Sequence, residues 1–306
     1  MNIISIIVPC YNEEESIGYF YKAIGEIGEK IKDAELELVF VDDGSKDNTY
    51  EKLCELHEKD ERVKCISFSR NFGKEAAIFS GLRAGKGDCF VVMDADLQHP
   101  PETILEMYDC WKQGYEVVEG VKKSRGKESG LHKWLANVFY DVISSTTHMD
   151  MRNSSDFKLM DKKVVKELCA LTEKNTFFRA LAYWVGFKST TVHYEVHERV
   201  AGKTKWSYWK LGKYAVKNLT SFTNAPLQII TILGLLFLII GAVLGIDAIV
   251  SFGRGIAVGG YPTLLILIVI STGAIMISLG IIGIYIAKIY DEIKNRPQYI
   301  IRDSKK

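Results

Sequence analysis

A chain of 306 residues can hold one soluble domain of roughly 200 residues together with a membrane segment. Its 39 basic and 38 acidic side chains give a net charge of +1, which provides no general field for attracting nucleic acid. The six cysteines are dispersed without a Cys-x-x-Cys pair, so we expect reduced thiols and neither a zinc site nor a disulfide framework.

The first 120 residues alternate short apolar runs with helix-like segments. The first run has no basic residue before it, so we expect a strand and not a signal peptide. Strands are predicted at 3–8, 36–41, 63–68, 88–93 and 116–120, and helices at 13–30, 47–59, 74–84 and 101–113. This alternation predicts an α/β fold whose mostly parallel sheet is covered by helices on both faces.

Polar side chains follow each of the first four predicted strands. They are Tyr11-Asn12-Glu13, Asp42-Asp43-Gly44-Ser45, Arg70-Asn71, and Asp94 with Asp96. In parallel sheets, ligands bind beyond the carboxyl ends of the strands, so four strand ends are expected to converge on one site. The paired carboxylates Asp94 and Asp96 are hard oxygen ligands that suit Mg²⁺ or Mn²⁺ carrying phosphates.

Further along the chain the pattern is less regular. We expect a helix at 129–147, a strand at 156–160, a helix at 162–170 and a strand at 189–196. Residues 206–222 are both aromatic and basic, which predicts a helix lying in the bilayer interface. The alternative for this segment is a domain helix with a solvated basic face.

Two apolar spans near the C-terminus, 227–246 and 262–287, carry no charged side chain. About 20 apolar residues are enough to cross a bilayer core. Five lysines between 203 and 217 precede the first span, and Lys288, Lys294 and Arg296 follow the second, whereas the connecting loop holds only Asp247 and Arg254 as charges. The positive-inside rule then predicts a multi-pass protein of the plasma (inner) membrane with both termini and the catalytic domain in the cytoplasm.

Four ordered motifs resemble those of glycosyltransferase family 2, in its polyprenyl-phosphate branch, which includes dolichyl-phosphate mannose synthases and bactoprenol glucosyltransferases. They are Val8-Pro9-Cys10-Tyr11-Asn12-Glu13, Val41-Asp42-Asp43-Gly44-Ser45, Ser69-Arg70-Asn71-Phe72-Gly73-Lys74 and Asp94-Ala95-Asp96-Leu97-Gln98-His99-Pro100-Pro101. The resemblance covers nearly the whole chain, and the two spans favour the bactoprenol type. It implies a Rossmann-like GT-A domain, a nucleotide-diphosphate sugar donor, a divalent metal and inversion at the anomeric carbon.

The resemblance also assigns candidate residues to the donor and the metal. Donor contacts are expected from Pro9, Tyr11, Asn12, Glu13, Asp42, Asp43, Arg70, Lys74 and Asp94, and metal contacts from Asp94, Asp96 and Gln98. Asp42 ends a strand, where a carboxylate can accept hydrogen bonds from a nucleobase or ribose. The alternatives are a capped turn at 42–45, ordinary surface charges at Arg70 and Lys74, and a loop Asx pair at 94–96.

For the acceptor, a lipid phosphate, the candidates are basic residues close to the membrane. These are Lys122, Arg125, Arg199 and Lys205, the last two within a segment similar to the family's Arg-x-x-Gly-x-Ser/Thr-Lys. Family members often carry Arg at the position of Lys122, which weakens the expectation of a bidentate phosphate contact there. A solvated basic surface is the alternative for each.

Two residues are assigned to catalysis, Arg199 and Asp156. Asp156 matches the position often proposed as the base in this family, although Ser155 stands where glycine is common. The alternative for Asp156 is to orient the acceptor or Arg199.

The predicted organisation is a transferase domain at 1–205, an interfacial helix at 206–226 and a two-helix anchor with a short cytoplasmic tail at 227–306. The predicted reaction moves glucose from a nucleotide sugar to undecaprenyl phosphate. Donors left open are GDP-mannose, UDP-galactose and UDP-N-acetylhexosamine. A processive polysaccharide synthase is disfavoured because the Gln-x-x-Arg-Trp motif of that class is missing, and a non-catalytic scaffold or flippase partner remains the alternative of another class. Glycines in the spans permit packing into dimers or tetramers.

Overall fold

A computed structural model describes residues 1–123, 155–173, 177–196, 225–255 and 260–305. The chain divides into two compact units. Unit 1 comprises Met1–Leu211 together with Pro297–Lys306, and unit 2 comprises Gly212–Arg296. Each unit is described separately below.

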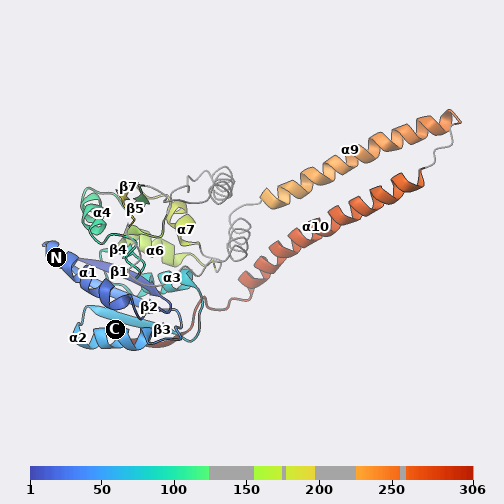
Figure 1. Ribbon diagram of the computed structural model, residues 1–306. Helices are drawn as coiled ribbons and strands as arrows, with labels where there is room; N and C mark the ends of the chain where they lie inside the picture. The colour runs from blue at the N-terminus through green and yellow to red at the C-terminus, as the bar shows by residue number, and fades with distance from the viewer. Residues whose placement is uncertain (124–154, 174–176, 197–224, 256–259, 306) are drawn as a thin grey trace. The chain divides into compact units, whose positions relative to one another are not determined.

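Unit 1 is built on a mixed, mostly parallel sheet (Figure 1). Its order is β7-β5-β6-β4-β1-β2-β3-β8. The strands are β1 (Asn2–Cys10), β2 (Ala34–Asp42), β3 (Val63–Phe68), β4 (Cys89–Val92), β5 (Val117–Lys122), β6 (Lys158–Asp161), β7 (Ser189–Tyr194) and β8 (Ile301–Lys305). The central strands β4, β1, β2 and β3 are parallel, so their carboxyl ends lie at one edge. The predicted α/β class with a mostly parallel sheet is confirmed.

Helices cover both faces of this sheet. They are α1 (Ile17–Lys30), α2 (Thr49–Lys59), α3 (Lys74–Ala84), α4 (Thr103–Lys112), α6 (Lys162–Ala170) and α7 (Phe178–Trp184). On one face, helices α1, α2 and α4 pack in one hydrophobic cluster with side chains of β1, among them Ile6. On the opposite face, α3 packs against Ile7, and a Cβ at Gly81 would lie 2.3 Å from the Ile7 Cγ2 atom. Glycine at this position therefore lets α3 approach the sheet closely.

Most predicted elements of unit 1 are present with shifted ends. The predicted helix at 13–30 begins at Ile17, because residues 13–16 form a turn in which the Ser16 N–H donates to the Glu13 carbonyl at 3.0 Å. Helix α6 begins at Lys162, where the Asp161 side chain accepts from the Lys163 N–H at 2.9 Å and caps the helix. Helix α7 was not predicted. The predicted helices at 129–147 and 206–222 lie outside the described residues.

The last strand was not predicted either. The sequence predicts an anchor with a short tail over residues 227–306, whereas β8, at the end of that range, pairs antiparallel with β3 at the edge of the sheet. Strand β8 is largely exposed and polar, so no hydrophobic alternation marks it in the sequence. Its place in the fold comes from backbone pairing with an edge that would otherwise be open.

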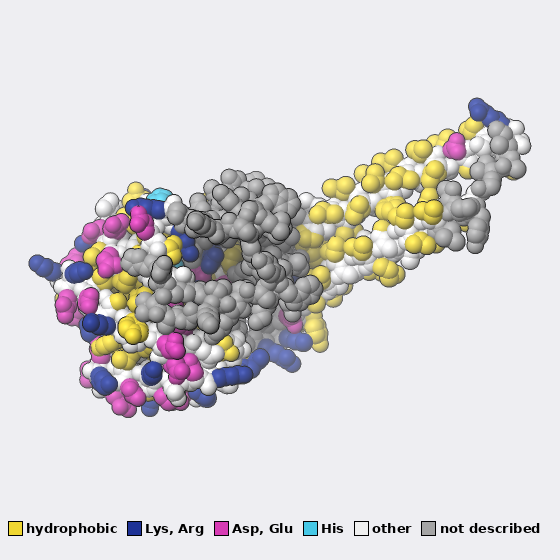
Figure 2. Space-filling view, in the orientation of Figure 1, with side chains coloured by type: hydrophobic (Ala, Val, Ile, Leu, Met, Phe, Trp, Pro, Cys, Tyr) yellow, Lys and Arg dark blue, Asp and Glu magenta, His cyan; other side chains and the backbone are white. Residues whose placement is uncertain are grey.

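Unit 2 contains two long helices, α9 (Ala225–Gly253) and α10 (Tyr261–Ile293). Stretches of both, Pro226–Gly253 and Ile266–Ile293, are long and apolar enough to cross a membrane, and none of their most apolar window is buried. Figure 2 shows the hydrophobic side chains along both helices. The predicted apolar spans lie within these two helices, which are candidates for membrane association.

Candidate functional site

A cavity of about 350 Å³ lies at the carboxyl ends of the central strands. Loops after β1, β2 and β4 and the start of α3 line it. The lining residues are Pro9, Cys10, Tyr11, Glu13, Asp43, Asn71, Gly73, Lys74, Ala77, Asp94, Ala95 and Asp96. Polar side chains from strand ends far apart in the sequence therefore meet at one place, as predicted from the strand order.

The loop after β1 is held by the loop after β2. Asn12 adopts a left-handed conformation with φ of 54°. Its backbone N–H donates to Ser45 Oγ at 2.9 Å, and its side-chain oxygen accepts from the Lys46 N–H at 2.9 Å. The next residue, Glu13, donates its N–H to Thr49 Oγ1 at 2.9 Å. Asn12 thus braces the loop, while Tyr11 and Glu13 face the cavity.

The two adjacent aspartates at the end of β2 have different environments. Asp42 is completely buried, and its carboxylate accepts from the Ser45 N–H at 2.9 Å and from Ser67 Oγ at 2.7 Å. It does not line the cavity, whereas its place at a strand end predicts a contact with a nucleobase or ribose. Its role in this structure is to fix the turn at residues 42–45.

Asp43 does line the cavity. Its carboxylate accepts from the backbone N–H groups of Phe72 at 2.6 Å and Gly73 at 2.9 Å. Burial raises the pKa of Asp43 to about 6, against the lowering effect of these two bonds. Of the two aspartates, Asp43 is placed to meet a ligand.

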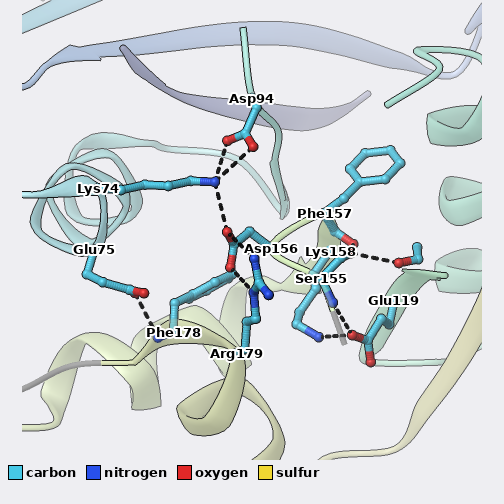
Figure 3. A network of polar contacts seen from close by, with 11 residues as sticks. Lys74, Glu75, Asp94, Glu119, Ser155, Asp156, Phe157, Lys158, Phe178 and Arg179 are labelled. Carbon is cyan, nitrogen blue, oxygen red and sulfur yellow. Dashed lines mark hydrogen bonds and ion pairs between the residues drawn. The ribbon is translucent and has the colours of Figure 1, made fainter. Parts of the chain in front are cut away.

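Lys74 joins two carboxylates at the start of α3, as Figure 3 shows. Its Nζ lies 2.6 Å from Asp94 Oδ1 and 2.8 Å from Asp156 Oδ2. Loss of water around the partly exposed Lys74 ammonium would lower its pKa, but the two carboxylates outweigh this effect and raise that pKa. The ammonium group is therefore held charged at the cavity.

Asp156 is also paired with Arg179, which comes from α7. Arg179 Nε lies 2.7 Å from Asp156 Oδ1, and its Nη2 lies 3.0 Å from Oδ2. Burial would raise the pKa of Asp156, but Lys74 and Arg179 overcome it and hold that pKa well below its usual range. Its two cationic partners therefore favour the ionised form of Asp156.

Helix α7 is fixed near the site by Glu75. The carboxylate of Glu75 accepts from the Phe178 N–H at 2.8 Å, immediately before Arg179 (Figure 3). Burial raises the pKa of Glu75 to about 7. Sequence reasoning missed both Glu75 and Arg179 because neither belongs to a motif with a recognisable spacing.

The proposed metal ligands are only partly gathered. Asp94 and Asp96 both line the cavity, whereas Gln98 does not, and the Gln98 N–H donates to Asp96 Oδ1 at 3.2 Å. Within the described residues, no group of three or more acidic, histidine or cysteine side chains could hold an ion. Two carboxylates at a cavity nevertheless fit a Mg²⁺-type ion that takes its other ligands from phosphates and water. The cationic Lys74 Nζ beside Asp94 shows that this carboxylate accommodates positive charge.

The remaining candidates are not brought together in the described residues. Arg70 does not line the cavity, and its guanidinium lies 4.5 Å from the centre of the Phe72 ring. Lys122 is exposed at the end of β5. Arg125, Arg199 and Lys205 lie outside the described residues.

A Rossmann-like, mostly parallel sheet with an acidic cavity at its strand ends defines the GT-A class of transferases. The fold agrees with that of mannosyl-3-phosphoglycerate synthase from Rubrobacter xylanophilus, with a TM-score of 0.52, 16% identity and 72% of each chain covered. The chain belongs to the family described as glycosyl transferase family 2, whose model matches residues 5–180.

Similarity to individual relatives extends over nearly the full length. The chain is 42% identical to the uncharacterized glycosyltransferase YkcC of Bacillus subtilis, covering 98% of this chain and 93% of the relative. It is 40% identical to the SfII prophage-derived bactoprenol glucosyl transferase of Shigella flexneri, covering 98% of each chain. The resemblance to the polyprenyl-phosphate branch, based on four motifs, is confirmed.

Proposed function

We propose that this protein transfers glucose from a nucleotide-diphosphate sugar to polyprenyl phosphate at a membrane. The observation that carries the proposal is the full-length similarity to relatives named bactoprenol glucosyl transferase, combined with a cavity that collects Asp43, Lys74, Asp94 and Asp96. In the reaction, the bond between the anomeric carbon and the diphosphate breaks. A lipid phosphate oxygen forms the new bond from the opposite face, and the nucleoside diphosphate leaves.

The nucleoside end of the donor is assigned to the loops after β1 and β2. Pro9, Tyr11, Glu13 and Asp43 line this part of the cavity. Asp43 is already oriented by two backbone N–H groups, so little ordering remains when a ligand binds. Asn12 and Asp42 support these loops from behind and are assigned to positioning.

A divalent cation, Mg²⁺ or Mn²⁺, would be held by Asp94 and Asp96. When bound, it would neutralise charge on the leaving diphosphate. Lys74 lies between Asp94 and Asp156 and supplies a further fixed positive charge for the phosphates. Arg179 holds Asp156, and Asp156 in turn holds Lys74, so we assign Asp156 to positioning and not to proton abstraction.

The acceptor needs little general-base help, because its phosphate oxygen is already anionic. Positioning and charge screening then dominate the catalysis of this step. Arg199 is the proposed lipid-phosphate contact, with Lys122, Arg125 and Lys205 as further candidates. Arg199→Ala should weaken use of the lipid phosphate far more than donor binding, and an equal loss of both would contradict this role.

The membrane topology follows from chain connectivity and charge. Both ends of unit 2 continue into unit 1, because β8 pairs with β3 after the second apolar helix. Unit 1 can therefore lie on one side of the membrane only if the chain of unit 2 crosses the membrane an even number of times. The basic flanks of the two spans then favour a catalytic unit and both termini on the cytoplasmic side of the plasma membrane.

A donor screen tests the function. The full-length protein in detergent receives undecaprenyl phosphate, Mg²⁺ or Mn²⁺ and one nucleotide sugar at a time, and the lipid product is identified by mass spectrometry. We expect a hexose adduct with UDP-glucose that disappears with EDTA. If a lipid adduct forms with GDP-mannose, UDP-galactose or UDP-N-acetylhexosamine instead, the sugar of that donor is the one transferred, and not glucose. Absence of any adduct from folded protein would favour the non-catalytic scaffold.

A further inference from the structure

The C-terminal strand is part of the sheet of unit 1 and pairs with β3, whose following loop contributes Asn71 and Gly73 to the cavity lining. Strand β8 pairs antiparallel with β3, and Ser67 lies opposite Asp303 in this register. The pairing extends past the strand, where the Ser69 N–H donates to the Ile300 carbonyl at 3.0 Å. The end of the chain therefore lies along the strand that leads into the loop at residues 69–73.

A chain of hydrogen bonds runs from this strand to the loops of the cavity. Arg302 Nη2 donates to Ser67 Oγ at 3.0 Å, and Ser67 Oγ donates to Asp42 Oδ2 at 2.7 Å. The other oxygen of Asp42 accepts from the Ser45 N–H at 2.9 Å, and Ser45 Oγ accepts from the Asn12 N–H at 2.9 Å. These contacts join β8 to β3, β3 to β2, and the loop after β2 to the loop after β1, so a continuous set of hydrogen bonds connects Arg302 with Asn12.

A second, apolar route leads to the same place. The ring of Tyr299 stacks on Phe68 with centroids 4.8 Å apart and planes 13° apart. Phe68 in turn meets the edge of Phe72 at 5.8 Å. The Phe72 N–H donates to Asp43 Oδ1 at 2.6 Å. The polar route reaches Asp42 and the apolar route reaches Asp43, the two adjacent residues at the end of β2.

We propose that residues 299–302 are positioning residues for the donor nucleotide. The C-terminal strand aligns the loops that contain Asn12 and Asp43, and this role rests on the proposed function. The hydrogen bond between Ser67 and Asp42 is buried, and Arg302 donates to Ser67 from an exposed strand. Loss of the Arg302 hydrogen bond leaves Ser67, and through it the turn at Asp42, with one partner fewer. A looser pocket must be ordered when the nucleotide binds, which weakens binding without changing the reacting groups.

The test compares point variants of the full-length protein in detergent. Arg302→Leu removes the donor to Ser67 and keeps the strand backbone. We expect the Kd for UDP with Mn²⁺ and the KM for the sugar donor to rise about threefold to tenfold, as for loss of one hydrogen bond. The kcat at saturating donor should stay within about twofold of wild type. Arg302→Lys keeps a charged donor on a long side chain and should recover part of the affinity.

Lys305→Ala is the matched control, because it removes a charge from an exposed position of the same strand. It should leave the Kd for UDP unchanged. An equal rise of the Kd for UDP in Lys305→Ala and Arg302→Leu would overturn the proposal. Any disturbance of the sheet edge at β8 would then be enough to weaken nucleotide binding. An unchanged Kd in Arg302→Leu, or a fall in kcat with KM unchanged, would overturn it as well.

The same experiment separates this proposal from the function on which it rests. If wild-type protein binds UDP or GDP with Mn²⁺ and Arg302→Leu binds it equally well, only the role of the C-terminal strand fails. If folded wild-type protein binds neither nucleotide and transfers no sugar, the proposed function fails and this inference fails with it.

Discussion

The strands of unit 1 and the helices of unit 2 are made from the same apolar residue types but place them differently. In β1, Ile4, Ile6 and Ile7 are fully buried, whereas Leu238 in α9 is 69% exposed and Ile277 in α10 is 65% exposed. Burial of apolar surface contributes about 25 cal/mol per Å². The exposed apolar side chains of α9 and α10 are therefore stable only when an apolar partner covers them. The same composition therefore forms a core in unit 1 and an exposed apolar surface suited to lipid contact in unit 2.

This difference predicts that the chemistry and the membrane association can be disrupted separately. Changes at the cavity of unit 1 should leave membrane association intact. Changes on the exposed face of unit 2 should leave nucleotide binding intact.

The largest effect is expected for Asp96→Asn. Loss of one carboxylate from the proposed metal site should lower the transfer rate at least about a thousandfold, since a bound metal contributes several kcal/mol to transition-state stabilisation. The measurement is formation of lipid-linked sugar at saturating Mn²⁺, alongside flotation of the protein with vesicles. Asp109→Asn is the control, because Asp109 is 65% exposed on α4 and lies outside the cavity. A near-normal rate in Asp96→Asn would contradict the metal assignment.

A second effect concerns unit 2. Leu238→Arg places a charge near the middle of α9, which costs about 2.5 to 3.5 kcal/mol at the centre of a membrane helix and should shift membrane insertion by about a hundredfold. Resistance to carbonate extraction measures it. Phe252→Arg, at the end of the same helix, should cost much less because the side chain can reach the interface. Equal behaviour of the two variants would argue that α9 does not cross the bilayer.

An effect of about tenfold is expected for Arg179→Gln. Asp156 would lose one of its two cationic partners, and a hydrogen bond to a charged group contributes at least about 1.5 kcal/mol, which corresponds to about tenfold. We expect a lower kcat and a lower melting temperature, both partly restored in Arg179→Lys. Unchanged kcat in Arg179→Gln would show that Asp156 and Lys74 keep their positions without α7.

The smallest effect is a pH dependence arising from Asp43. Its pKa of about 6 in the folded protein exceeds the value near 4 of the unfolded chain, so between these values the folded state binds more protons. The contribution of Asp43 to the free energy of unfolding is therefore greatest below pH 4 and falls as the pH rises to 6. Phe72 and Gly73 donate to Asp43, and the neighbouring Asp42 repels its charge.

Calorimetry of wild type and Asp43→Asn between pH 4 and 7 measures this effect. The melting temperature of wild type relative to the variant should fall by a few degrees as the pH rises through this window. A difference that is constant or increases with pH would contradict the raised pKa.

The sequence predicted the parts of this protein that depend on local pattern. Strands β1 to β4, the alternating helices and the two apolar spans have clear hydrophobic periodicity or length. Part of each motif at the strand ends also lines one cavity, because the carboxyl ends of parallel strands lie at one edge of the sheet.

Only the tertiary structure decided which of these residues line the cavity. Asp42 and Asp43 are indistinguishable in the sequence, yet contacts with Ser67 bury the first and the second lines the cavity. Arg179 reaches Asp156 through the placement of α7, and Arg302 reaches Ser67 across 235 residues of chain. Such contacts follow from the packing of whole elements and from edge pairing, and no local periodicity records them.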